Sequence, residues 1–244
     1  MTSGEKTSLA FFLDTASGFL SGGYAPKRDY DFSDDPPPAA GFSSLPLAYQ
    51  VDEEEATGAE TLDDIAEAIR RCDACALCRE RKLAVPGEGA SDPLVMVVGE
   101  GPGEAEDKSG RPFVGPAGQY LDRMLGSINL SRDKNCFIAN TVKCHPPGNR
   151  DPLPEESGAC AHFLEAQIRA LRPKVIFCVG RIAAQHLLES SEGIGKLRGR
   201  FFEMEKFGGI PLLATYHPSA LLRDETFKRP VWEDLKLLKA RLSL

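Results

Sequence analysis

The sequence contains a continuous apolar run that ends in a glycine-rich turn, Leu94-Val-Met-Val-Val-Gly99-Glu-Gly-Pro-Gly-Glu104. Apolar residues without alternation are typical of a strand buried on both faces, as in a parallel sheet. Ligands of such sheets bind beyond the carboxyl ends of the strands. The run therefore predicts an α/β fold with a binding site close to Gly99.

Strands and helices alternate after this run. Besides the strand at 94–98, the pattern predicts a helix at about 117–128, a strand at 136–140, a helix from Pro154 through Leu171, strands at 175–179 and 212–216, and a final helix ending near Leu242. Such alternation predicts a central, mostly parallel sheet flanked by helices on both faces. Gly99 to Gly103, Asn140 to Asn149 and His217 onward should then converge at one edge of the sheet.

The first 60 residues differ in composition from the rest. Apolar residues at helical spacing predict an amphipathic helix within residues 1–20, which could pack on the main body or dock on a partner protein. Residues 21–60 are rich in proline, glycine and acidic side chains, which predicts a linker. We expect the main domain to span residues 61–244, with residues 1–60 as an N-terminal extension.

The net charge of −7 does not exclude a nucleic-acid partner, because most of it belongs to the extension. Residues 1–60 carry a net charge of −8 and residues 61–244 a net charge of +1. A nearly neutral domain can still present a local basic groove to DNA. The chain has no apolar run of the roughly 20 residues needed to span a bilayer and no secretory pattern, so we expect a cytoplasmic location without a membrane partner.

Seven cysteines in such a chain favour metal ligands or buried thiols over disulfides. Cys72 and Cys75 have the spacing of a metal clip, and two further ligands could come from Cys144 and Cys160. Four thiolates suit zinc or an iron–sulfur cluster, and spacing alone does not choose between them. Other interpretations remain open: Cys144 and Cys160 could be small core residues, as we expect for Cys136 and Cys178, and Cys78 could replace Cys75 or be a bystander.

The glycine-rich turn is not a phosphate-binding loop. A P-loop has glycine directly before its lysine, whereas Asp107 precedes Lys108 here. The carboxylates of Glu100, Glu104 and Glu106 would also repel phosphate. They suit work on a water molecule or a cationic intermediate instead.

From about Thr61 to Leu244 the sequence resembles the family 4 uracil-DNA glycosylases. The motifs that carry the resemblance are Cys72-x-x-Cys75, Gly99-Glu-Gly-Pro-Gly-Glu104, Gly110-Arg-Pro-Phe113-Val-Gly-Pro-Ala-Gly118, Asn140-Thr-Val-Lys-Cys144-His-Pro-Pro-Gly-Asn149-Arg150, Cys160 and His217-Pro-Ser-Ala-Leu221-Leu-Arg223. The resemblance implies the uracil-DNA glycosylase fold and a 4Fe-4S cluster held by Cys72, Cys75, Cys144 and Cys160, which leaves Cys78 outside the pattern. It also implies a monofunctional enzyme of base excision repair, without lyase activity, that acts on uracil-containing DNA, and we expect a monomer.

The resemblance further implies roles for individual residues. Phe113 would stack on the flipped uracil, Asn140 would read its edge and His217 would donate to O2, while Gly101 and Pro102 would line the pocket. Glu100 would position or activate water, with Glu106 as a second candidate. Taken singly, Phe113 could equally be a core residue, Asn140 a turn residue and His217 a structural histidine.

Three residues are expected to contact DNA. Leu221 would fill the gap left by the flipped base, although a core leucine is an equally natural interpretation, and exposure of its side chain decides between them. Arg150 and Arg223 would bind the backbone.

Other functions are compatible with parts of the pattern. A family 5 enzyme would lack the glutamate at position 100, and a glycosylase of wider scope could also act on hypoxanthine or xanthine. From another class, the chain could be a non-catalytic DNA-binding module stabilised by zinc, or a domain whose acidic extension, residues 1–60, recruits a repair or replication protein.

Overall fold

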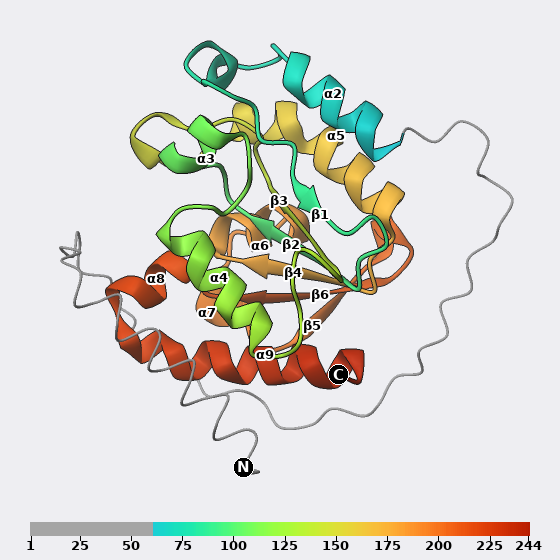
Figure 1. Cartoon of the computed structure of the whole chain (residues 1–244). Coiled ribbons are helices and arrows are strands. Elements are labelled where there is room, and N and C mark those ends of the chain that lie inside the picture. Colours follow the sequence, from blue (N-terminus) through green and yellow to red (C-terminus); the bar gives the residue numbers. More distant parts are fainter. Residues whose placement is uncertain (1–60) are drawn as a thin grey trace, which may run out of the picture.

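Four parallel strands form the centre of the sheet in the computed structural model, which describes residues 61–244 (Figure 1). They are β2 (Val95–Gly99), β3 (Cys136–Asn140), β4 (Val175–Val179) and β6 (Ile210–Thr215). Two antiparallel strands close the edges, β1 (Glu88–Gly89) beside β3 and β5 (Phe201–Met204) beside β6. The predicted parallel strands are confirmed, and the two edge strands were not predicted.

Helices cover both faces of this sheet, as the sequence predicts. One face carries α4 (Pro116–Gly126), α8 (Pro218–Arg223) and α9 (Lys228–Leu242), and the other carries α5 (Pro154–Leu171), α6 (Arg181–Leu188) and α7 (Ile194–Leu197). α2 (Leu62–Arg71) packs on α5, and α3 (Glu104–Ser109) follows β2 directly (Figure 1). Short 3-10 turns occupy Ala76–Arg79, Pro147–Asn149, Glu205–Phe207 and Glu225–Phe227.

The two cores follow from alternation along the central strand. Val95 and Val97 of β2 face the core under α4 and α9, while Met96 and Val98 face the core under α5 and α6. All four side chains are fully buried. A strand covered on both faces must be apolar at every position, which explains the continuous run in the sequence.

The strand order β1-β3-β2-β4-β6-β5 determines where the site lies. β2 has β3 on one side and β4 on the other, so the chain crosses over β2 on its way from β3 to β4. This is the switch in strand order at which α/β sheets open a crevice. The backbone N–H of Thr141 donates to the Gly99 carbonyl at 2.9 Å, so the segments after β2 and β3 stay together beyond the sheet.

Within residues 61–244, no helix has the length and apolar character required to cross a membrane. The amphipathic helix predicted in residues 1–20 and the linker predicted in residues 21–60 lie outside the described residues.

Candidate active site and cysteine-lined pocket

Gly99 forms the floor of a small site at the end of β2. A β-carbon at this position would lie 2.4 Å from Cζ of Phe113 and 2.5 Å from Oδ1 of Asn140. Any side chain would therefore collide with both residues. The glycine lets an aromatic ring and an amide approach the same stretch of backbone, which confirms that these motifs converge.

Asn140, the last residue of β3, has an unusual hydrogen-bonding state. Its side chain is 1% exposed, and its Oδ1 atom has no hydrogen-bond partner among the described residues. A buried polar atom without a partner costs free energy, so such atoms are rare unless a ligand completes them. The backbone carbonyl of Asn140 is fixed by the buried Nζ of Lys143, which donates to it at 2.8 Å and to Oε1 of Gln167 at 2.7 Å.

Phe113 reaches this site from the loop before α4. Its backbone is in the left-handed region with φ of 52°, which is uncommon for a residue other than glycine. The Phe113 ring lies with its centroid 5.8 Å from that of His217, tilted by 36°. Phe113, Asn140 and His217 thus come from three separate segments of the chain to one place.

His217 begins α8 with its imidazole orientation fixed. Nδ1 accepts the backbone N–H of Ser219 at 3.2 Å and lies 2.7 Å from the Ser219 hydroxyl. Because Nδ1 is an acceptor, the proton of the neutral ring is on Nε2. Burial lowers the pKa of His217 to about 4, with Arg223 acting in the same direction and Glu106 opposing. The ring is therefore neutral at neutral pH.

Glu100, directly after the floor glycine, is partly buried. Burial raises its pKa to about 7, Asp151 adds to the rise, and Arg181 opposes it. A carboxyl group with this pKa can accept a proton from water near neutral pH. The backbone carbonyl of Glu100 accepts the N–H of Val142 at 3.1 Å, which fixes the turn that carries it.

The carboxylate of Glu106 accepts hydrogen bonds from the backbone. Its Oε1 atom accepts the N–H groups of Val114 and Gly115, both at 2.8 Å, and its Oε2 atom accepts that of Gly103 at 3.1 Å. Both carboxylate oxygens are thus engaged in holding the loop before α4 against the turn after β2. Glu106 therefore organises the backbone around Phe113, a role that the sequence did not predict, and the expected role in handling water stays a prediction.

The wedge expected at Leu221 is corrected. Its side chain is 1% exposed and belongs to the apolar core that α8 shares with α4 and α9. Arg150 forms two hydrogen bonds with the Glu156 carboxylate, at 2.8 and 2.7 Å, so its guanidinium fastens the loop to the start of α5. Arg223, at the end of α8, is exposed.

Gly101 and Pro102 lie in the turn after β2, and their expected place in the lining of the uracil pocket stays a prediction. Nδ1 of His145 lies 2.8 Å from the Pro102 carbonyl oxygen, and since a carbonyl only accepts, Nδ1 is the donor. A β-carbon on Gly101 would lie 2.9 Å from Val142. The loop after β3 therefore packs closely on the turn after β2.

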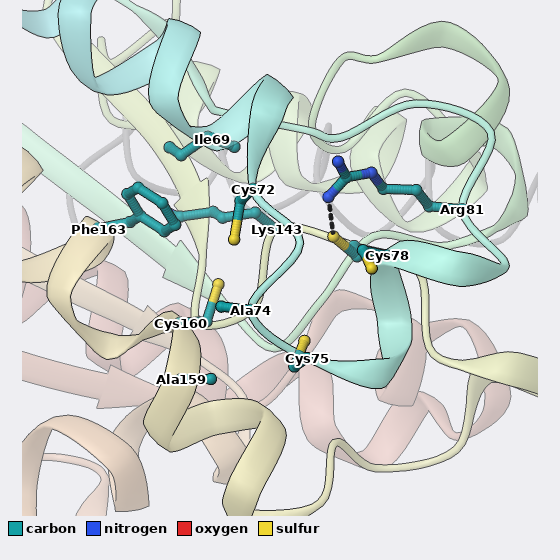
Figure 2. A pocket seen from close by; sticks show the side chains of 11 residues that line it. Ile69, Cys72, Ala74, Cys75, Cys78, Arg81, Lys143, Ala159, Cys160 and Phe163 are labelled. Carbon is teal, nitrogen blue, oxygen red and sulfur yellow. Dashed lines mark hydrogen bonds between the residues drawn. The ribbon is translucent and has the colours of Figure 1, made fainter.

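A pocket lined by cysteines lies beside the loop after β3, which contributes Lys143 and Cys144 to its lining. Cys72 at the end of α2, Cys75, Cys144 after β3 and Cys160 of α5 all line it, as does Cys78 (Figure 2). In Figure 2 the thiols of Cys72 and Cys160 point toward each other. Spacing alone left open whether Cys144 and Cys160 were core residues, whereas the structure places both with the first pair. Cys136 and Cys178 are fully buried in strands, as predicted.

Two basic side chains, those of Arg81 and Lys143, line the cysteine pocket. Nη1 of Arg81 donates to the Cys144 sulfur at 3.0 Å, and Nη2 donates to the Arg70 carbonyl at the end of α2. Burial raises the pKa of Cys160 to about 11, with Lys143 opposing. A thiol with so high a pKa becomes a thiolate when a metal supplies the compensating charge. Among the described residues, no three acidic, histidine or cysteine side chains are gathered as ligands of a single metal ion.

Comparison with known proteins agrees with this geometry. A model of the uracil DNA glycosylase superfamily matches residues 86–236. The type-4 uracil-DNA glycosylase of Saccharolobus solfataricus is 43% identical over 190 residues, which cover 75% of this chain and 88% of the relative. That of Thermotoga maritima is 42% identical over 187 residues, covering 75% of this chain and 96% of the relative.

A type-5 relative matches less of the chain. The type-5 uracil-DNA glycosylase of Thermus thermophilus is 34% identical over 152 residues, covering 55% of this chain and 68% of the relative. Because the superfamily model covers more than half of the chain and the type-4 relatives match along most of their length, this chain belongs to the uracil-DNA glycosylase superfamily and, within it, to the type-4 group.

Proposed function

We propose that this chain removes uracil from DNA by hydrolysing its N-glycosidic bond, which leaves an abasic site. The observation that carries the proposal is the buried, unpartnered Oδ1 atom of Asn140 between Gly99 and Phe113. An amide offers one acceptor and one donor. Uracil presents N3–H and O4, which complement both, whereas cytosine presents an acceptor at N3 and an amino group at C4.

The base must leave the duplex stack before it can enter so closed a site. Phe113 offers the flipped base an aromatic face, and Asn140 reads its edge. Gly99 has no side chain, so the Phe113 ring and the Asn140 amide can both lie close to its backbone. Arg223 supports the proposal as an exposed cation beside the His217 segment that can bind a phosphate.

His217 would stabilise the leaving uracil anion. The contact with the Ser219 N–H keeps the Nε2 proton available as a donor to O2, and the neutral ring needs no deprotonation. A fixed donor aimed at developing charge in a site without water typically contributes a few kcal/mol of transition-state stabilisation, about 3 kcal/mol.

Glu100 would act on the other side of the glycosidic bond. When ionised, its carboxylate can hold water for attack on C1′ and oppose the positive charge that develops on the sugar. Its raised pKa makes it a better proton acceptor than an exposed glutamate at neutral pH.

The cysteine pocket would hold a 4Fe-4S cluster through Cys72, Cys75, Cys144 and Cys160. Four thiols that line one pocket can give each iron of such a cluster its own cysteine ligand. When bound, the cluster supplies a covalent brace between α2, α5 and the loop after β3. That loop continues from Asn140, so the brace supports the base-reading amide.

The proposal is tested with oligonucleotides that contain one uracil, one cytosine or one hypoxanthine. The wild-type chain should release uracil alone, whereas release of hypoxanthine at a similar rate would favour the glycosylase of wider scope. Asn140→Asp should lower uracil excision by roughly 100-fold, because the donor to O4 is lost. A protonated aspartate matches cytosine, so the ratio of cytosine to uracil release should rise.

Asn129→Asp is the matched control, because it makes the same change at an exposed position outside the site. It should leave the rate and the base choice unchanged. If Asn140→Asp behaves like this control, Asn140 does not read the base and the assignment of the pocket is wrong.

A further inference from the structure

The backbone at Phe113 is held in its uncommon conformation by contacts on two sides. Gly118 of α4 lies so close that a β-carbon there would be 2.0 Å from both the carbonyl carbon and the carbonyl oxygen of Phe113. On the other side, Glu106 accepts the N–H of the next residue, Val114, at 2.8 Å. A left-handed backbone at a phenylalanine persists only when its surroundings impose it, and such positions cluster at functional sites.

Arg132 makes the remaining contacts with this segment. It lies in the loop between α4 and β3, and its side chain is only 11% exposed. Nη1 donates to the carbonyl of Pro112 and Nη2 to that of Phe113, both at 2.9 Å. One guanidinium therefore holds two successive carbonyls at the point where the chain turns the Phe113 ring toward Asn140.

Two carboxylates orient the Arg132 guanidinium. Oε1 of Glu88, on the edge strand β1, accepts from Nη1, and Oδ1 of Asp122, on α4, accepts from Nε at 3.0 Å and Nη2 at 2.8 Å. Glu88 pairs with Ile138 across β1 and β3, so Glu88 connects the guanidinium to β3, the strand that carries Asn140. These contacts use the planar fork of arginine, which a lysine ammonium cannot reproduce.

We propose that Arg132 is a positioning residue for base recognition, which acts by clamping the Pro112 and Phe113 carbonyls so that the Phe113 ring faces the flipped base. This inference rests on the stacking role proposed for Phe113. The clamp ties the aromatic face of the pocket to the strand that presents the base-reading amide. Misplacement of the ring would act on the geometry of the bound base rather than on the capture of DNA.

A double-mutant cycle tests the clamp, with single-turnover excision from a uracil oligonucleotide as the readout. Arg132→Met should lower kcat by about 10- to 100-fold and change KM by less than about threefold, because a displaced ring misorients a bound base. Arg132→Lys should not restore the rate. In a Phe113→Ala background, Arg132→Met should add less than about a threefold further loss, since the two residues act through one contact.

Arg169→Met is the control, because it makes the same substitution at an exposed, ion-paired arginine of α5 that takes no part in the Arg132 network. It should retain the wild-type rate within about twofold, as for an exposed ion-pair partner. If circular dichroism shows that Arg132→Met is unfolded, Glu88→Gln replaces it in the double-mutant cycle. Its loss of kcat should be smaller and should also vanish in the Phe113→Ala background.

Each outcome decides between the two proposals. If the losses from Arg132→Met and Phe113→Ala multiply in the double variant, or if Arg169→Met loses as much as Arg132→Met, the clamp is wrong and Arg132 only stabilises the fold. Full activity of Phe113→Ala would instead overturn the stacking role, and the clamp with it. Loss in Phe113→Ala together with normal activity in Arg132→Met would overturn the clamp alone.

Discussion

At the residue scale, Glu100 and Glu106 show how two glutamates six positions apart acquire different roles. The carboxylate of Glu106 accepts three backbone N–H groups, and these hydrogen bonds hold the loop that carries Phe113. Glu100 has a raised pKa because it is buried close to Asp151. Glu100 is therefore the glutamate that we propose to act on water.

The pH dependence of excision should report on Glu100. Its ionised form is the one that can accept a proton, so the rate should rise with pH through a midpoint near the pKa of about 7. His217 adds no step in this range, because its pKa is about 4. Glu100→Gln should lower the rate and remove the midpoint. A variant with the same pH profile as the wild type would show that another group titrates.

The raised pKa of Glu100 also affects the free energy of unfolding, which should fall as pH rises while the excision rate increases. A carboxyl group whose pKa is higher in the folded state than in the unfolded state favours folding when protonated, and this contribution is lost as pH rises toward 7. Glu100→Gln should therefore have a higher free energy of unfolding than the wild type at pH values above about 7, by the same linkage. Denaturant unfolding of both proteins on either side of this pH measures the difference.

At the element scale, the start of α4 is shaped to receive the Phe113 loop. Gly118 lies in the first turn of the helix, where its missing side chain makes room for the Phe113 carbonyl. At Gly126, the other end of the same helix, a β-carbon would meet no atom within 4 Å among the described residues. The two glycines thus differ in packing within one element.

Alanine substitution should separate the two glycines of α4. Gly118→Ala should lower the free energy of unfolding by about 1–3 kcal/mol and reduce excision, because the new methyl group displaces the Phe113 backbone. Gly126→Ala should be neutral or raise stability by up to about 1 kcal/mol, since alanine favours helix. Urea midpoints of both variants give the comparison. Equal effects at the two positions would mean that the close approach at Gly118 is relieved without cost.

At the scale of the whole molecule, the cysteine pocket joins parts of the chain that are distant in sequence. Cys72 and Cys75 precede the sheet, whereas Cys144 and Cys160 follow its second parallel strand. A cluster bound to all four would connect α2 to the catalytic sheet. α2 otherwise packs mainly on α5.

Serine substitution should distinguish the four proposed ligands from the fifth cysteine. Cys72→Ser and Cys160→Ser should lose bound iron and broad visible absorbance, and should unfold at a lower temperature, because metal binding is coupled to folding. Cys78→Ser should keep its iron content, its spectrum and its melting temperature. Iron loss in Cys78→Ser would make Cys78 a ligand and require that one of the other four be withdrawn.

Much of the fold follows from local patterns. The apolar strands at 95–99, 136–140 and 175–179 were predictable because burial on both faces requires apolar side chains at every position. The edge strands β1 and β5 were missed because two and four residues of mixed polarity carry no periodic signal. Convergence of the glycine turn, Asn140 and His217 was predictable because parallel strands end at one edge of a sheet.

The sequence by itself determined the parallel sheet, the superfamily motifs and the residue types that we propose to meet the base. Only the tertiary structure decided that Leu221 is a core residue, that Glu106 organises backbone and that Arg132 holds the Phe113 loop. The physical reason is that burial and hydrogen bonding depend on partners distant along the chain, as between Arg132 and Glu88, 44 residues apart. Residue types and their spacing specify what a side chain can do, and its neighbours in space determine what it does.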